Sequence, residues 1–257
     1  MRIIRFESEG NARYGRLLDD GTAVACDGNP FDGLKDTSRQ IDTKQLRLLP
    51  PVPTGKIIGV GLNYRAHAKE HRQTLPAEPL LFHKPISALV GNGAPIALRY
   101  SEKHNDEEAE LVIVICRRAR RISLHDAAAH ILGYTAGNDV TDRDTQVEDR
   151  NWTARSKGFD TYAPVGPCVA TDIDPRDLAI SARINGKQVQ NSSTNDLVFG
   201  AFELVSFISH VCTLEPGDLI FTGTPSGVSR IQPGDKVEVE IAGIGVLSNP
   251  VIDAASA

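Results

Sequence analysis

The stretch Glu108-Ala-Glu-Leu-Val-Ile-Val-Ile115 (EAELVIVI) decides how the fold is read. Its last five residues, from Leu111 on, are all apolar and mostly β-branched, with no polar residue between them. A strand with one face in water alternates apolar and polar side chains, whereas a strand covered on both faces does not need to. This stretch therefore predicts a strand that is buried on both sides.

Two glutamates open this strand. Glu108 and Glu110 are separated by one residue, and the two-residue period of a strand points both carboxylates to one face, about 6.5 to 7 Å apart along the backbone. An E-x-E pair alone also fits a solvated strand edge. Asp139 follows the stretch 134–138, where a neighbouring strand could bring it beside the pair. Three oxygen ligands without His or Cys would select a hard ion such as Mg²⁺, Mn²⁺ or Ca²⁺.

The first 50 residues read as a small β-subdomain. Asp20-Gly21 signals a turn between two of its short strands. The proline-rich stretch at 50–55, PPVPTG, cannot continue a helix or a central strand. We therefore predict an N-terminal β-subdomain at 1–50 and a second domain at 51–257. The strands expected in the subdomain are Arg2–Phe6, Tyr14–Leu18 and Thr22–Ala25.

The second domain is expected to hold many short strands and few helices. The composition of 65–72 favours a short polar helix. Ser123 resembles a helix cap and Gly133 a helix stop, which predicts a helix of about ten residues between them. Another helix should begin near Asp196, with apolar residues at helical spacing on one face. These patterns predict a β-rich α+β fold. The expected strands are 56–60, 219–222 and 236–241.

Composition and charge exclude several classes of protein. The 257 residues carry a formal net charge of −5 with acidic and basic residues intermixed, so no nucleic-acid footprint stands out. No apolar run approaches the roughly 20 residues that a membrane helix needs. The four cysteines lie far apart and read as reduced thiols. We therefore expect a cytoplasmic protein that binds neither nucleic acid nor membrane.

His67 and Glu70 lie three residues apart on the expected helix at 65–72, so their side chains share a face. A carboxylate beside an imidazole raises its basicity, which suits a general base that removes a proton from water. An exposed ion pair on a polar helix would have the same spacing. The spacing alone leaves both interpretations open.

Six motifs follow one another along the chain: GLNYRAHAKE at 61–70, FHKP at 82–85, EAEL at 108–111, GNDVTDRDTQ at 137–146, SKGFDTYAPVGP at 156–167 and LEPGDLIFTGTPSGV at 214–228. In this order they resemble the fumarylacetoacetate hydrolase family, in its branch of bacterial acylpyruvases and 2-hydroxyhepta-2,4-diene-1,7-dioate isomerases. The resemblance implies a mixed β-sandwich roll, an Mg²⁺ or Mn²⁺ ion and a homodimer.

The resemblance also implies roles for individual residues. Its metal ligands are matched by Glu108, Glu110 and Asp139, and the catalytic His and Glu of its mobile lid by His67 and Glu70. The remaining matches are Lys157 as a catalytic lysine, and Arg143, Gln146 and Thr224 as substrate-binding residues. Arg143 could hold a substrate carboxylate or brace Asp139.

The implied substrate is a small 2-oxo acid that chelates the ion. As a hydrolase of an acylpyruvate such as fumarylpyruvate or acetylpyruvate, the enzyme would activate water with His67 and Glu70, stabilise the oxyanion with Lys157 and Gln146, and stabilise the enolate on the metal. An isomerase or an oxaloacetate decarboxylase would use the same metal site without attacking water. A binding protein without turnover would not need His67 and Glu70.

Overall fold

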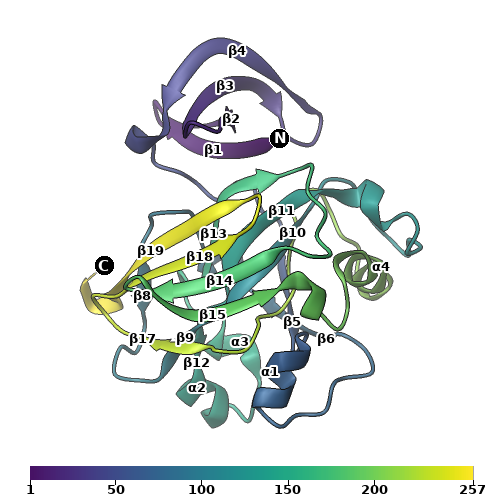
Figure 1. Ribbon diagram of the computed structural model, residues 1–257, viewed down its shortest axis with the longest axis vertical. Coiled ribbons are helices and arrows are strands. Elements are labelled where there is room, and N and C mark those ends of the chain that lie inside the picture. The colour runs from purple at the N-terminus through teal and green to yellow at the C-terminus, as the bar shows by residue number, and fades with distance from the viewer. Residues whose placement is uncertain (257) are drawn as a thin grey trace.

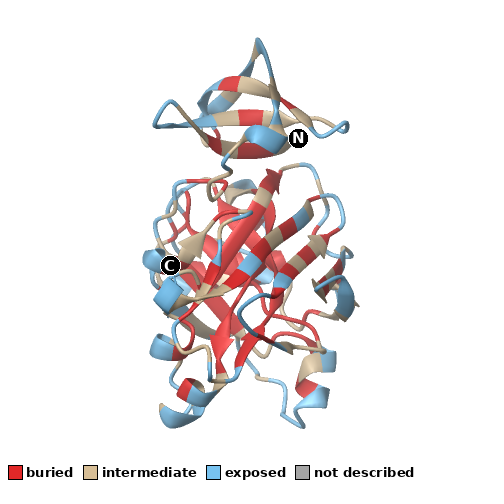
Figure 2. Ribbon diagram, turned by 90° about the vertical axis from the view of Figure 1, so that its left-hand side faces the viewer, coloured by how far each residue is buried: buried red, intermediate tan, exposed pale blue. Residues whose placement is uncertain are grey.

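Strand β10 (Ala109–Ile115) lies in the middle of the core, and all of its residues are buried. The computed structural model describes residues 1–256. In it, Leu111 and Ile113 belong to one apolar cluster, whereas Val112 and Val114 belong to another. The prediction of a strand buried on both sides is confirmed. Figure 2 shows the buried residues concentrated where the strands of the main body overlap.

The main sheet has 11 strands in the order β4-β3-β2-β1-β13-β11-β10-β16-β5-β6, with β7 pairing with β13 beside this path. Most neighbours are antiparallel, but β16 runs parallel to β5 and β7 runs parallel to β13, so the sheet is mixed. The bounds are β1 Arg2–Ser8, β2 Asn11–Leu17, β3 Thr22–Asn29, β4 Gly33–Asp42, β5 Ile57–Gly61, β6 Leu80–Lys84, β7 Leu89–Val90, β11 Ile131–Asn138, β13 Ala163–Ala170 and β16 Leu219–Phe221.

A five-stranded sheet in the order β15-β14-β18-β19-β8 packs on this main sheet, and a three-stranded sheet, β12-β9-β17, lies beside them. Ile180 of β14 and Val239 of β18 share an apolar cluster with Leu111 and Ile113 of β10. This packing confirms the β-rich fold class. The bounds are β8 Ile96–Leu98, β9 Asn105–Glu107, β12 Thr141–Asp142, β14 Ala179–Ile184, β15 Lys187–Ser193, β17 Ser229–Ile231, β18 Lys236–Ile241 and β19 Gly245–Asp253.

The N-terminal strands β1 to β4 form an antiparallel meander at one end of the molecule (Figure 1). The meander continues the main sheet, because Arg2 and Ile3 of β1 pair with Ala170 and Val169 of β13. Strand β4 was missed in the sequence, since most of its residues are exposed and polar and give no apolar period. The domain boundary at residue 50 stays a prediction.

The α-helices found within residues 1–256 are short except for α4, which packs its apolar face on the core. Helices α1 to α3 gather at the end of the molecule opposite the meander (Figure 1). No helix in this part of the chain is long and apolar enough to cross a membrane. The bounds are α1 Arg65–Glu70, α2 Arg143–Glu148, α3 Thr153–Ser156 and α4 Ala201–Val211, with 3₁₀ turns at Thr43–Gln45, Ile86–Ala88, Ala127–His130, Thr194–Asp196 and Ala254–Ser256.

Two helix predictions were wrong in whole or in part. Between Ser123 and Gly133 the chain forms only a 3₁₀ turn and then enters β11. Gly133 is not a helix stop but a point of close strand approach, because a Cβ there would lie 2.3 Å from the carbonyl oxygen of Ala170. The helix expected from Asp196 begins at Ala201, after a separate 3₁₀ turn.

The burial of β10 predicts a large loss of stability when one of its side chains is truncated. Ile113→Ala should lower the free energy of unfolding by about 2 to 5 kcal/mol, because it removes buried apolar contacts and leaves a cavity. The matched control is Ile86→Ala, whose side chain is 53% exposed and whose truncation should cost no more than about 0.5 kcal/mol. Urea unfolding of both variants checks this, and equal losses would contradict the assigned core.

Candidate active site

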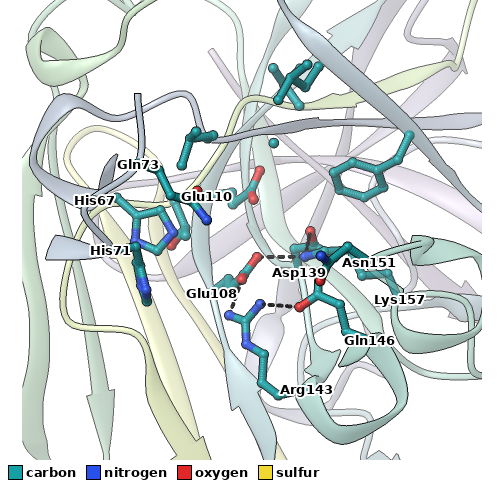
Figure 3. Close-up of a pocket in the computed structure, with 16 residues that line it drawn as sticks. His67, His71, Gln73, Glu108, Glu110, Asp139, Arg143, Gln146, Asn151 and Lys157 are labelled. Atoms are coloured by element: carbon teal, nitrogen blue, oxygen red, sulfur yellow. Dashed lines mark hydrogen bonds and ion pairs between the residues drawn. The ribbon is translucent and has the colours of Figure 1, made fainter. Parts of the chain in front are cut away.

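A pocket of about 450 Å³ opens where α1, α2 and the residues after α3 face the ends of β5, β10 and β11. Figure 3 shows His67 and His71 on one side of it and Lys157, Gln146 and Arg143 on the other. Every residue that the sequence predicted for the site lines this pocket except Glu70, which lies on the same helix as His67.

Three carboxylates converge in the pocket. Glu108 precedes β10, Glu110 lies within it, and Asp139 follows the adjacent strand β11, whose Asn138 pairs with Ala109. Asp139 also donates its amide N–H to the Glu108 carbonyl oxygen at 2.9 Å. The pairing of β10 with β11 therefore places the three side chains together. All three are buried, and each offers an oxygen that lies within 4.8 Å of the others.

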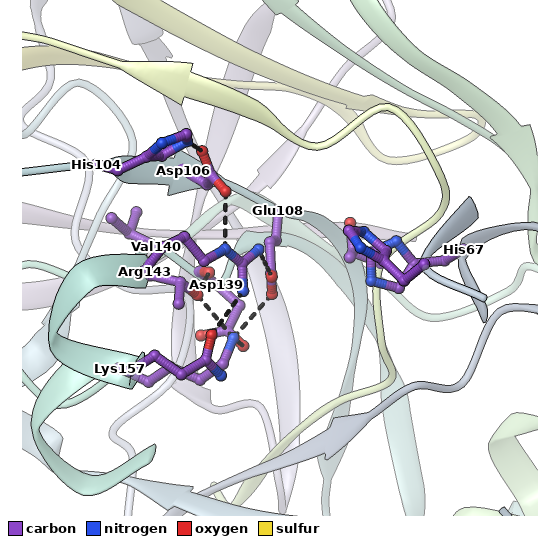
Figure 4. Close-up of polar contacts among 12 residues, drawn as sticks. His67, His104, Asp106, Glu108, Asp139, Val140, Arg143 and Lys157 are labelled. Atoms are coloured by element: carbon purple, nitrogen blue, oxygen red, sulfur yellow. Dashed lines mark hydrogen bonds and ion pairs between the residues drawn. The ribbon is translucent and has the colours of Figure 1, made fainter. Parts of the chain in front are cut away.

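Three cations hold two of these carboxylates. Lys157 donates to Glu108 at 2.8 Å and to Asp139 at 2.5 Å, while Lys84 pairs with the other oxygen of Asp139. Arg143 donates to the other oxygen of Glu108 (Figure 4). Both lysines are buried, so these pairs form where water screens little. The charges of Glu108 and Asp139 are balanced by the protein itself.

Glu110 has a different environment. Its one assigned hydrogen bond within the described residues comes from the Gly223 amide at 2.7 Å, and no Lys or Arg pairs with it. Burial, reinforced by repulsion from Asp139 and Glu108, raises the pKa of Glu110 well above its ordinary value. For Glu108, burial acts in the same direction, but Lys157 and Arg143 outweigh it and lower the pKa.

The donor set fits a hard divalent ion. Glu110 is an uncompensated carboxylate beside two others, and a cation within their reach would remove the repulsion that raises its pKa. The trio contains no nitrogen or sulfur, and such oxygen-only sets suit Mg²⁺, Mn²⁺ or Ca²⁺. Glu108, Glu110 and Asp139 are therefore the residues that could hold such an ion in this pocket.

Arg143 braces the site rather than pointing freely into it. Besides Glu108, it donates to Asp106 at 2.7 Å and to the Gln146 side-chain oxygen at 3.2 Å. Of the two roles left open by the sequence, bracing is the one seen, but the carboxylate it braces is Glu108 and not Asp139. Its hydrogen bond to Gln146 leaves only the Nε2–H groups of that amide to contact a substrate oxygen.

His67 faces this charged group from α1. Its side chain is 13% exposed, and its Nδ1 has no hydrogen-bond partner in the described chain. Glu70 lies 3.7 Å from that Nδ1, which is close but not a hydrogen bond. Burial lowers the pKa of His67 below 6.5, although Glu108 acts against it. The lowered pKa favours the neutral imidazole, which is able to accept a proton.

The sequence did not point to several residues that order the site. Lys84, at the end of β6, was part of the FHKP motif but received no role, because nothing local shows that a lysine will be buried. Gln190 donates to Thr224 at 2.9 Å and accepts from the Ala109 amide at 2.9 Å, so it links Thr224 to β10. No spacing in the sequence marks this long-range contact.

Fold and pocket together define a β-rich protein with a buried carboxylate trio that could hold a divalent ion. Residues 56–252 match the family described as fumarylacetoacetate (FAA) hydrolase C-terminal, and residues 1–51 match Rv2993c-like, N-terminal. Because the first match spans most of the chain, the protein belongs to the fumarylacetoacetate hydrolase family. The resemblance seen in the sequence is confirmed, and the chain is an enzyme of this superfamily.

Relatives with different activities share this fold. The crystal structure of 2-hydroxyhepta-2,4-diene-1,7-dioate isomerase from Mycobacterium marinum is 40% identical, with a TM-score of 0.90 and coverage of 98% of both chains. Fumarylpyruvate hydrolase from Pseudomonas aeruginosa, solved with Mn²⁺ and pyruvate, is 35% identical, with a TM-score of 0.72 and coverage of 80% of this chain and 92% of that one. The mitochondrial oxaloacetate tautomerase fahd2 of Xenopus laevis is 36% identical over 98% of this chain and 90% of its own.

The charge balance around Asp139 predicts how Lys84→Met will respond to an ion. Removing one partner of a buried ion pair should lower stability by about 3 to 5 kcal/mol. Saturating Mn²⁺ should recover more of the melting temperature than it does for Lys56→Met, because an ion at the trio would replace the lost cation. Lys56 pairs with buried Asp218 outside the pocket and serves as the control. Equal recovery in thermal melts would contradict an ion at the trio.

Proposed function

We propose that this protein is a divalent-metal-dependent hydrolase that cleaves a C–C bond in a small acylpyruvate-type 2-oxo acid, such as fumarylpyruvate or acetylpyruvate. One observation carries the proposal: the imidazole of His67, whose buried Nδ1 has no hydrogen-bond partner in the described chain, lies in the same pocket as the carboxylate trio. Binding a 2-oxo acid needs no such base, whereas activating water does. The Mn²⁺ and pyruvate bound to the related fumarylpyruvate hydrolase support the same substrate class.

The trio of Glu108, Glu110 and Asp139 would hold Mg²⁺ or Mn²⁺ and leave coordination positions for the substrate. When bound, the ion supplies Lewis-acid stabilisation of the negative charge that develops on the 2-oxo oxygen. Gln146 would donate its Nε2–H to the oxygen at the distal carbonyl, since its own carbonyl oxygen is used by Arg143. Thr224, held by Gln190, also lines the pocket and would contact the substrate there.

Lys157 would have to exchange partners to take part in the reaction. An ammonium group has three N–H donors, and those of Lys157 already reach Glu108, Asp139 and Thr141. A carboxylate oxygen that turns toward a bound ion would release one of these donors. That donor could then stabilise the oxyanion formed when water attacks the distal carbonyl.

His67 would accept the proton of the attacking water. Glu70, 3.7 Å from Nδ1, needs only a small movement to hydrogen-bond that nitrogen and raise the basicity of the other. Glu70 is itself held by the Gly227 amide at 3.2 Å. The dyad is thus nearly assembled, and closure of the last turn of α1 would complete it.

Keto–enol isomerisation is the second candidate. The isomerase of Mycobacterium marinum and the oxaloacetate tautomerase of Xenopus laevis each align with 98% of this chain, including its N-terminal residues. Such a reaction moves a proton between carbon and oxygen and needs no attacking water. His67 could carry that proton, and the same trio could stabilise the enolate, as it could in a decarboxylase of oxaloacetate.

Loss of Glu110 should remove ion binding and turnover together. Glu110→Gln should weaken Mn²⁺ binding by at least about 10 to 100-fold, because loss of even an indirect partner of a ligand costs that much. Glu107→Gln is the matched control, since Glu107 is also buried and burial raises its pKa as well, but it does not belong to the carboxylate trio. Titration calorimetry and turnover assays with added Mn²⁺ measure both. Full activity in a Glu110→Gln protein that binds no ion would sink the site assignment.

Loss of His67 should separate hydrolysis from the other reactions. His67→Ala should lower acylpyruvate cleavage by about 10² to 10⁴-fold, the usual contribution of a general base. Mn²⁺ affinity should hardly change, and decarboxylation of oxaloacetate should fall less, because it depends mainly on charge stabilisation at the trio. One preparation with saturating Mn²⁺ is assayed for all reactions. Equal losses in cleavage and decarboxylation would remove the main support for a hydrolase, and isomerisation without any cleavage in the wild type would replace it with the second candidate.

A further inference from the structure

Helix α1 and the residue that ends it carry a second group of metal-ligand side chains. His67, Glu70 and His71 stand at positions i, i+3 and i+4, which share one face of a helix. Each offers a ligand atom within 4.8 Å of the other two. Among residues 1–256, the carboxylate trio and this group are the two sets of His, Cys, Asp or Glu side chains that lie close enough together to hold a metal ion. The catalytic proposal uses His67 and Glu70 but gives no role to His71.

The distances within the group are close to those around a tetrahedral ion. Oε2 of Glu70 lies 3.7 Å from Nδ1 of His67 and 3.9 Å from Nε2 of His71. Ligand atoms about 2.0 to 2.2 Å from a tetrahedral ion lie about 3.3 to 3.6 Å from one another. The two distances from Glu70 therefore need to shorten by only a few tenths of an ångström, and the ligand nitrogens of the two imidazoles lie within 4.8 Å of each other. The two imidazole rings already lie edge to face, with centroids 4.6 Å apart.

The hydrogen bonds of these side chains leave their ligand atoms available to an ion. Nδ1 of His67 is buried and has no hydrogen-bond partner in the described part of the chain. Neither contact of Glu70 with the two imidazoles is short enough to be a hydrogen bond. The Gly227 amide, which donates to the same Glu70 oxygen at 3.2 Å, would orient the carboxylate as outer partners of metal ligands do.

We propose that His67, Glu70 and His71 form a second cation site that takes a borderline ion of the Zn²⁺ type. Two imidazoles and one carboxylate suit zinc, whereas the oxygen-only trio suits Mg²⁺ or Mn²⁺. The two groups line or adjoin one pocket but select different ions. Half of the His71 side chain is exposed, so water can occupy the fourth position.

Zinc at this site would inhibit the enzyme, and this consequence rests on the proposed function. An ion on Nδ1 of His67 replaces the hydrogen bond that Glu70 would form there. Its positive charge lowers the basicity of the other ring nitrogen, which can then no longer activate water. Inhibition should therefore occur while Mg²⁺ or Mn²⁺ still fills the carboxylate trio.

Direct binding tests the site without any assay of turnover. The full chain, saturated with Mg²⁺, competes for Zn²⁺ with a chromogenic chelator. His71→Gln should weaken zinc binding by at least about tenfold, because it removes a ligand. His125→Gln is the matched control, since His125 is 96% exposed and belongs to neither ligand group. Unchanged zinc affinity in His71→Gln would overturn the proposal.

The second readout is the turnover rate in the presence of Zn²⁺. For each variant it is divided by the rate of the same variant without zinc. In the wild type and in His125→Gln, zinc should inhibit, and tenfold more Mg²⁺ should not relieve the inhibition. In His71→Gln the inhibitory concentration should rise in step with the weakened binding. Relief by Mg²⁺ would place the zinc at the carboxylates and overturn the proposal. Zinc binding that depends on His71, in a protein that cleaves no acylpyruvate, would leave this site standing and sink the hydrolase assignment instead.

Discussion

The buried pairing of Asp139 with Lys84 and Lys157 is the interaction on which the rest of the site depends. A lone carboxylate inside a protein becomes protonated rather than bear the loss of water, and a lone lysine loses its proton for the same reason. Paired, Asp139 and each lysine give one another an opposite partner. The partners come from the end of β6, the residue after β11 and the residue after α3, so the charges balance only once these segments have assembled on the main sheet.

The same pairing explains why Glu110 stands apart. Glu108 and Asp139 share three cations, and Arg143 divides its charge between Glu108 and Asp106. Among residues 1–256 no Lys or Arg pairs with Glu110, and burial raises the pKa of this carboxyl, which favours its neutral form when no ion is bound. With all three carboxylates in their charged form, the pocket therefore demands a further positive charge. An acidic substrate would add to that demand, which is why binding of a 2-oxo acid and of a divalent ion should reinforce each other.

Local sequence patterns predicted the features that follow from the two-residue period of a strand. The apolar run 111–115 indicated a strand buried on both faces, and its two-residue period put Glu108 and Glu110 on one side. The contacts that the sequence could not show are those between distant segments. Gly133 looked like a helix stop because the close approach of Ala170 is invisible locally. The burial of Lys84 likewise follows from the packing of β6, not from its neighbours in sequence.

The choice of reaction depends on α1 more than on the carboxylates. The trio is held by paired strands and buried cations, whereas α1 is anchored mainly at its first turn, where Arg65 and Ala66 bond to residues 195–197. Its last turn carries Glu70 and His71, whose side chains are exposed, and there the Gly227 amide donates to Glu70. Relatives named as isomerase, hydrolase and tautomerase share this fold, so the sheet cannot be what distinguishes them. Under the proposed function, the enolate would be stabilised in the same place for all three reactions. What would differ is whether a base is brought against a water molecule or against a substrate carbon, and the proposed base, His67, lies on α1, whose last turn is exposed.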